Sequence, residues 1–89
     1  MAQSLKDKVA AALVEATGED AHVELEDVPD DMIGGFVLWH SFAPLSPTQR
    51  QDRIWKSLDE RLTPLERARV VFIVADTPEE YATLKKAAG

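Results

Sequence analysis

Apolar residues recur every three or four positions over residues 5–16 and then at alternate positions over residues 21–26. The first spacing predicts an amphipathic helix, with Ser4 as its N-cap. Its apolar stripe consists of Leu5, Val9, Ala12, Leu13 and Ala16. In the second segment Ala21, Val23 and Leu25 alternate with polar residues, which predicts a strand with one buried face. Val28-Pro29-Asp30-Asp31 should break this strand, and Gly34-Gly35 should close the connection that follows.

Two later segments are apolar at every position, namely residues 36–39 and 70–75. Continuous apolar runs are typical of strands that are central in a sheet or covered on both faces. The run over residues 70–75 is also rich in β-branched residues, which favour strands. The segment between the two runs has helical spacing, so the connection is a crossover. If the two strands are neighbours, they should therefore run parallel.

Three helix starts share one short phrase, a Ser or Thr followed by Pro, with an amide or acid in the third position after the cap. Such a residue set predicts a capping box with Pro in the first turn. The phrases are Ser46-Pro47-Thr48-Gln49, Thr63-Pro64-Leu65-Glu66 and Thr77-Pro78-Glu79-Glu80. The helix that starts after Ser46 should run to about Leu62, and the one that starts after Thr63 should be a short turn. The helix that starts after Thr77 should bury Tyr81 and Leu84. The helix over residues 47–62 should bury Ile54, Trp55, Leu58 and Leu62.

The predicted order of elements is α-β-β-α-(α)-β-α over residues 1–89. This order describes one α+β domain with a three-stranded mixed sheet packed by helices. The 89 residues suffice for one modest core. The chain has no cysteine, no apolar run long enough to span a membrane and no signal-peptide pattern at its start, which favours a cytoplasmic protein.

The net charge of −6 is unevenly distributed. Residues 1–45 carry two lysines against nine acids, whereas residues 46–69 carry six basic residues against four acids. An acidic chain repels phosphate at long range, which disfavours general nucleic-acid binding. Positive charge gathers only along the helix predicted from residue 47 to residue 62.

Two segments resemble the BolA family, whose layout is similar to a class II KH fold. The first is Arg50-Gln51-Asp52-Arg53-Ile54-Trp55-Lys56-Ser57-Leu58, followed by Glu60 and Leu62, and the second is Thr77-Pro78-Glu79-Glu80-Tyr81. The resemblance spans most of the chain. It implies a non-catalytic protein-interaction or regulatory module whose partner belongs to the class of monothiol glutaredoxins. The partner surface expected first lies on the helix over residues 47–62, at Arg50, Gln51, Arg53 and Lys56.

The chain departs from the BolA pattern where that family binds metal. The family's signature histidine, which helps to ligate a shared iron–sulfur cluster, falls on Gln51. A glutamine amide oxygen is a poor ligand for such a cluster. A second family ligand, His or Cys, lies between the first two strands, where residues 28–35 offer only Asp30 and Asp31. We therefore expect no cofactor and no shared cluster.

The alternative function is nucleic-acid binding by a KH-like domain through residues 47–62. The basic residues there are Arg50, Arg53, Lys56 and Arg61. They alternate with acids at helical spacings, so a solvated helix face with local ion pairs is the favoured explanation of these residues. Leu62-Thr63-Pro64-Leu65 also lacks the glycines of the KH backbone clamp.

Other candidate chemistry is sparse. His22 and His40 are the only histidines, and as a metal pair they would lack a third ligand, so we expect one surface histidine and one that packs beside Trp39. Asp27, Asp30 and Asp31 lack the spacing of a calcium loop. No Ser-His-acid arrangement follows from the spacing, so the sequence predicts no catalytic residue and no enzyme. The spacing of Trp39 and Trp55 within their predicted elements places them at core positions, so we expect both to serve packing.

Overall fold

The computed structural model describes residues 4–88, and its elements follow the predicted order. The elements are α1 (Leu5–Ala16), β1 (His22–Val28), β2 (Met32–Leu38), the 3-10 turn η1 (His40–Phe42), α2 (Pro47–Arg61), α3 (Pro64–Arg67), β3 (Val70–Asp76) and α4 (Pro78–Ala88). The three strands lie in the order β1-β2-β3, with β1 antiparallel and β3 parallel to β2. The predicted α+β domain with a mixed sheet and a parallel crossover pair is confirmed.

Each predicted capping phrase starts a helix as expected. Ser46, Thr63 and Thr77 each accept a hydrogen bond from the backbone N–H three residues on, and the side chain of that third residue accepts from the N–H of the cap. These reciprocal bonds satisfy two donors that a helix N-terminus otherwise leaves unpaired. Ser4 caps α1 in the simpler way, by accepting from the N–H of Asp7.

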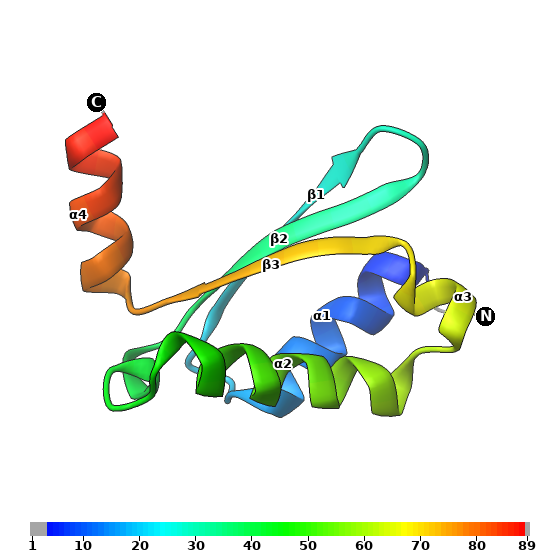
Figure 1. Ribbon diagram of the computed structural model, residues 1–89, viewed down its shortest axis with the longest axis horizontal. Coiled ribbons are helices and arrows are strands. Elements are labelled where there is room, and N and C mark those ends of the chain that lie inside the picture. The colour runs from blue at the N-terminus through cyan, green and yellow to red at the C-terminus, as the bar shows by residue number, and fades with distance from the viewer. Residues whose placement is uncertain (1–3, 89) are drawn as a thin grey trace.

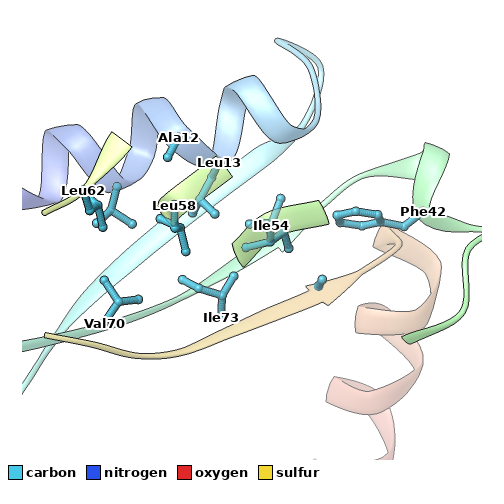
Figure 2. Packing of buried hydrophobic residues seen from close by; sticks show 11 residues of the cluster. Ala12, Leu13, Phe42, Ile54, Leu58, Leu62, Val70 and Ile73 are labelled. Carbon is cyan, nitrogen blue, oxygen red and sulfur yellow. The ribbon is translucent and has the colours of Figure 1, made fainter. Parts of the chain in front are cut away.

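Helices α1 and α2 pack against one face of the sheet, and the core lies between these layers (Figure 1). The side chains of α1 and α2 meet those of β2 and β3 there (Figure 2). The buried apolar cluster consists of Val9, Ala12, Leu13, Val37, Phe42, Ile54, Leu58, Leu62, Val70, Ile73 and Ala75. Helix α4 stands at the opposite end of the sheet from the β1–β2 turn (Figure 1).

The strand register assigns every sheet residue to one of two faces, because residues directly opposite each other share a face. Three rows across the sheet point to the core: Val23–Val37–Ala75, Leu25–Gly35–Ile73 and Asp27–Ile33–Val70. Three rows lie on the other face, which we call the open face: His22–Leu38–Asp76, Glu24–Phe36–Val74 and Glu26–Gly34–Phe72. As predicted, β2 is central, but helices α1 and α2 cover only one of its faces.

The prediction that Gly34 and Gly35 close a loop is wrong. Both lie inside β2, and the turn consists of Pro29, Asp30 and Asp31, with positive φ at both aspartates (71° and 60°). The glycines are needed for packing, since the Phe72 ring lies over Gly34 on the open face and Leu25 lies against Gly35 on the core face.

The prediction that α4 buries Leu84 is also wrong, because Leu84 is 60% exposed. Tyr81, one turn earlier, is half-buried, and its ring packs edge-on against Phe36 at 5.9 Å between centroids. The first turns of α4 therefore hold the helix to the sheet. The rest of the helix projects from the body of the protein.

We expect Gly35→Ala to destabilise the protein more than Gly34→Ala. A methyl group at residue 35 would lie 2.5 Å from the carbonyl oxygen of Glu24, which is fixed by strand pairing. At residue 34 the methyl group would instead meet the Phe72 ring at 2.2 Å, and this half-buried ring can move toward solvent. Urea unfolding should give a loss of about 1–3 kcal/mol for Gly35→Ala. An equal or larger loss for Gly34→Ala would contradict this.

Candidate functional site

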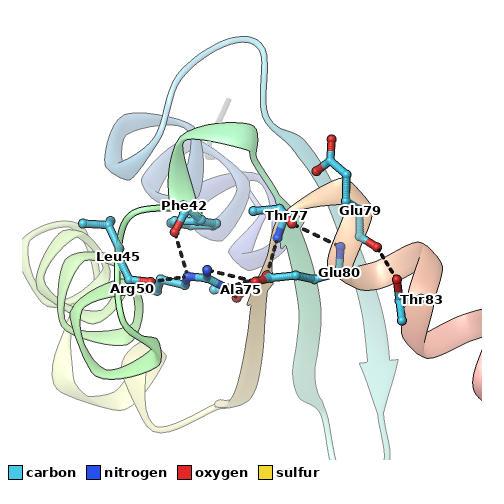
Figure 3. Close-up of polar contacts among 8 residues, drawn as sticks. All are labelled: Phe42, Leu45, Arg50, Ala75, Thr77, Glu79, Glu80 and Thr83. Atoms are coloured by element: carbon cyan, nitrogen blue, oxygen red, sulfur yellow. Dashed lines mark hydrogen bonds and ion pairs between the residues drawn. The ribbon is translucent and has the colours of Figure 1, made fainter.

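Arg50 is the most connected polar side chain at the end of the sheet near α4 (Figure 3). Its Nε donates to the carbonyl oxygens of Phe42 (3.0 Å) and Leu45 (3.1 Å), and one terminal nitrogen donates to the carbonyl of Ala75 (3.2 Å). Both terminal nitrogens also bind the carboxylate of Glu80, at 2.7 and 3.2 Å. The side chain is 6% exposed. The expectation that Arg50 lies on a solvated helix face is therefore wrong.

Glu80 joins this Arg50 contact to the start of α4. One of its oxygens accepts from Arg50 and also from the N–H of Thr77 in the capping box. The hydrogen bond from Arg50, followed by that from the Thr77 N–H, lowers the pKa of Glu80 from 4.5 to about 2. The same hydrogen bond raises the pKa of Arg50. The bidentate pair thus fixes α4 to α2 through a charged contact.

Gln51 bridges α2 and β3. Its amide nitrogen donates to the carbonyl of Ile73 (2.8 Å), and its amide oxygen accepts from the indole N–H of Trp55 (2.8 Å). β3 is an edge strand, so its outward carbonyls are open to pairing with another strand. Gln51 and Arg50 occupy two of them, those of Ile73 and Ala75. Both side chains therefore cap the edge of the sheet.

The other two predicted partner-binding residues, Arg53 and Lys56, differ in their contacts. Arg53 donates to the carbonyl of Ala16 at the end of α1, and its guanidinium carbon lies 5.5 Å from the centre of the Trp39 ring. A cation there complements the negative end of the helix dipole. Lys56 is exposed and makes no ion pair among residues 4–88. The structure therefore engages Arg50, Gln51 and Arg53 within the fold and leaves Lys56 at the surface.

Other basic residues of this region also bind neighbouring elements. Arg61 pairs with Glu15 of α1. Arg67 pairs with Asp59 (2.8 Å) and lies over the Trp55 ring at 4.1 Å. These ion pairs join different elements, whereas the sequence pattern predicted pairs along the helix.

A cleft of about 530 Å³ lies between the start of α2 and helix α4. It is lined by Pro47, Arg50, Asp76, Glu79, Glu80, Thr83 and Leu84. One carboxylate oxygen of Asp76 is buried there without a hydrogen-bond partner. Burial, with the nearby charge of Glu80, raises the pKa of Asp76, although Arg50 opposes this shift. The cleft thus combines three acids with an apolar wall, and Arg50 neutralises part of its charge.

The histidines and the turn aspartates do not come together as a metal site. His22 lies 3.3 Å from Glu24 and His40 lies 3.1 Å from Glu79, and each of these pairs is exposed. Asp27 pairs with Lys6 of α1 (3.0 Å). Among the residues that the structure describes, no group of three or more His, Asp or Glu side chains is placed to hold a metal ion. Trp39 and Trp55 pack against the core, as their period predicts.

Sequence reasoning missed two features of this region. The capping phrase identifies Glu80 as a helix-start residue, but its contact with Arg50 joins residues 30 positions apart and leaves no local signal. The open face was also missed, because Phe36, Phe72 and Val74 read as core positions in continuous apolar runs. The alternation of His22, Glu24 and Glu26 in β1 was the available signal that this face meets solvent.

Comparisons of the chain with protein-family models, with curated proteins and with solved structures give no match. Over the described residues 4–88, none of the helices has the length and apolar composition needed to cross a membrane. The chemistry of the protein must therefore be argued from its own residues.

We expect Glu80→Gln to lower the stability of the protein at pH 7 and to flatten its dependence on acid. Since the folded-state pKa of about 2 lies below the ordinary 4.5, the charge of Glu80 stabilises the fold above pH 4.5, and this stabilisation is lost as the pH falls toward 2. In urea unfolding from pH 7 to pH 2, the difference between wild type and variant should shrink below pH 4.5. Glu60→Gln, at an exposed position of α2, is the control. A difference that is constant over this pH range would contradict the assignment.

Proposed function

We propose that this protein is a non-catalytic protein-interaction module. The open face of the sheet carries the proposal. Phe36, Phe72 and Val74 lie side by side there on β2 and β3, and all three are only half-buried. Phe36 and Phe72 contact each other edge-on, with ring centroids 6.4 Å apart. An apolar surface of this kind on an antiparallel or mixed sheet is usually covered, and exposed apolar patches mark interaction sites.

The BolA resemblance supports the same class of function. The order of elements supports a BolA-like or class II KH-like domain. On this proposal the protein acts in the cytoplasm and binds a protein partner, for which the resemblance suggests a monothiol glutaredoxin. No catalytic step is assigned to it.

The contacts of α2 favour a protein partner over nucleic acid. Phosphate binding needs several cations that are free to approach a backbone. Arg50 is buried, Arg53 binds the end of α1 and Arg61 pairs with Glu15, so Lys56 is the cation of α2 without such a contact in the described chain. The positive charge that concentrates in this part of the sequence thus serves mainly to join α2 to α1 and α4.

Capture from cells that express the protein tests the proposal. Tagged wild type should enrich a specific protein, and Val74→Lys should lose it because a charge enters the apolar surface of the open face. Val14→Lys is the matched control, since it makes the same change at a 37% exposed position on α1. Lys56→Glu tests the exposed side of α2 in parallel.

A nucleic-acid titration accompanies this capture. With random DNA and RNA we expect no dissociation constant tighter than about 10⁻⁴–10⁻⁶ M at physiological salt, the range of non-specific binding. Tight, salt-sensitive binding that Arg53→Glu abolishes would replace the proposed function with the KH-like alternative. Failure of wild type to enrich any protein over the untagged control would also count against an interaction module.

We expect no shared iron–sulfur cluster with a monothiol glutaredoxin. Co-expression should yield the same visible absorption as the glutaredoxin alone, because Gln51 holds its amide toward Ile73 and Trp55, and the turn between β1 and β2 offers only aspartates. Gln51→His should not suffice to create a cluster, since a second imidazole or thiolate is still missing from the turn. A stable complex with shifted absorption in the wild type would overturn this prediction, and His40 or His22 would then be the ligand to mutate.

A further inference from the structure

The open face has charged residues at two of its borders. On its β1 side, Glu24 lies opposite Phe36 and Glu26 lies opposite Gly34, so a row of carboxylates borders the apolar centre. At the end of the face where α4 stands, this helix contributes the Tyr81 ring against Phe36, with the ammonium of Lys85 5.9 Å from the centre of that ring. The apolar centre thus has an acidic border along β1 and a helical wall with a cation at α4.

A hollow of about 240 Å³ marks the acidic border. It is lined by Glu24, Leu25, Glu26 and Phe36. Glu24 has only the exposed His22 near it (3.3 Å), and Glu26 makes no ion pair within residues 4–88. Carboxylates beside an aromatic ring suit a Lys or Arg side chain, whose charge meets the acids while its stem or guanidinium plane covers the ring.

The apolar residues lie on the face of the sheet and not along its edge, which restricts the form of an occupant. A segment on the face finds no backbone partners there, so it must satisfy its own N–H and C=O groups, as a helix does. The seven residues of β2 span about 23 Å, the length of about 15 helical residues. A helix of that length would cover the apolar centre.

A second copy of this chain is disfavoured by charge. Two open faces would each bring a border of Glu24 and Glu26 to the interface, and each chain carries a net charge of −6. Like charges brought together in this way cost free energy, whereas a basic segment gains from the same acids.

We propose that the open face binds a basic amphipathic helix of a partner protein. The apolar stripe of that helix lies over Phe36, Phe72 and Val74, and its Lys or Arg residues face Glu24 and Glu26. This inference rests on the proposed interaction function and specifies the chemistry of the partner.

A peptide titration tests the site without the natural partner. The probe is a peptide of about 15 residues made of Leu and Lys, with one apolar helical stripe, and the comparison peptide has Glu in place of Lys. We expect the Leu/Lys peptide to bind and to shift the backbone NMR signals of β1, β2 and β3 together with Tyr81. The Leu/Glu peptide should bind at least about tenfold more weakly, because like charges then meet at β1.

Charge reversal at two places distinguishes binding at the open face from general attraction of the basic peptide to an acidic protein. Glu24→Lys/Glu26→Lys should weaken binding of the Leu/Lys peptide about tenfold, since each exposed ion pair contributes up to about 1 kcal/mol and a tenfold change is about 1.4 kcal/mol. Asp52→Lys/Glu60→Lys makes the same change of net charge at exposed positions of α2, on the far side of the core, and should weaken it much less. Both variants are first checked for unchanged thermal unfolding.

Three outcomes would overturn the proposal: equal weakening by the two double variants, signal shifts confined to α1 and α2, or a concentration-dependent dimer that Val74→Lys disrupts. The result is also separable from the proposed function. If cells yield a specific partner that Val14→Lys and Val74→Lys both retain, the interaction module stands and this site fails. If the peptide binds as expected but no partner is captured, the site stands and the proposed function fails.

Discussion

The buried guanidinium of Arg50 is the contact on which the arrangement of α4 depends. It joins the turn before α2, the end of β3 and the capping box of α4, through the carbonyls of Phe42, Leu45 and Ala75 and the carboxylate of Glu80. A buried charge is costly unless it is paired and hydrogen-bonded, and the contacts with Glu80 and the three carbonyls meet that condition. Only the fork of an arginine matches the carboxylate and the carbonyls at once, so lysine is no substitute there.

This contact explains why one sheet face is left open. Arg50 binds the first turn of α4 at the end of β3, and the helix then projects from the body, with Tyr81 at the sheet and Leu84 exposed. With α4 held at the end of the sheet, Phe36 and Phe72 cover one another and the backbone of Gly34 in place of a packed helix. Gly34 is therefore part of the same arrangement, because its missing side chain lets the Phe72 ring lie against the strand.

Most of the fold was predictable from local signals. The capping phrases at Ser46, Thr63 and Thr77 depend only on residues three positions apart, so sequence alone located these helices. The parallel pairing of β2 and β3 followed from the crossover. Gly34 was misplaced because a glycine pair is equally typical of a turn and of a close approach within a strand, and only the position of Phe72 distinguishes the two. Sequence composition likewise marked residues 46–69 as basic but did not reveal which cations face solvent.

The location of each charge, more than the net charge, determines what this protein can bind. The arginines of α2 contact groups of opposite charge in neighbouring elements. Arg50 pairs with Glu80, Arg53 binds the end of α1 and Arg61 pairs with Glu15, so most basic side chains of this helix already have partners within the protein. Within residues 4–88, Glu24 and Glu26 of β1 have no such internal partner beyond His22, since they alternate outward from a strand whose other face is buried. A sheet that puts its strand acids and its uncovered aromatic rings on the same face attracts a ligand that is both basic and apolar. The BolA resemblance suggests α2 as the partner surface. The uncovered apolar residues and the acids that favour binding of such a ligand lie instead on the open face, on the opposite side of the sheet.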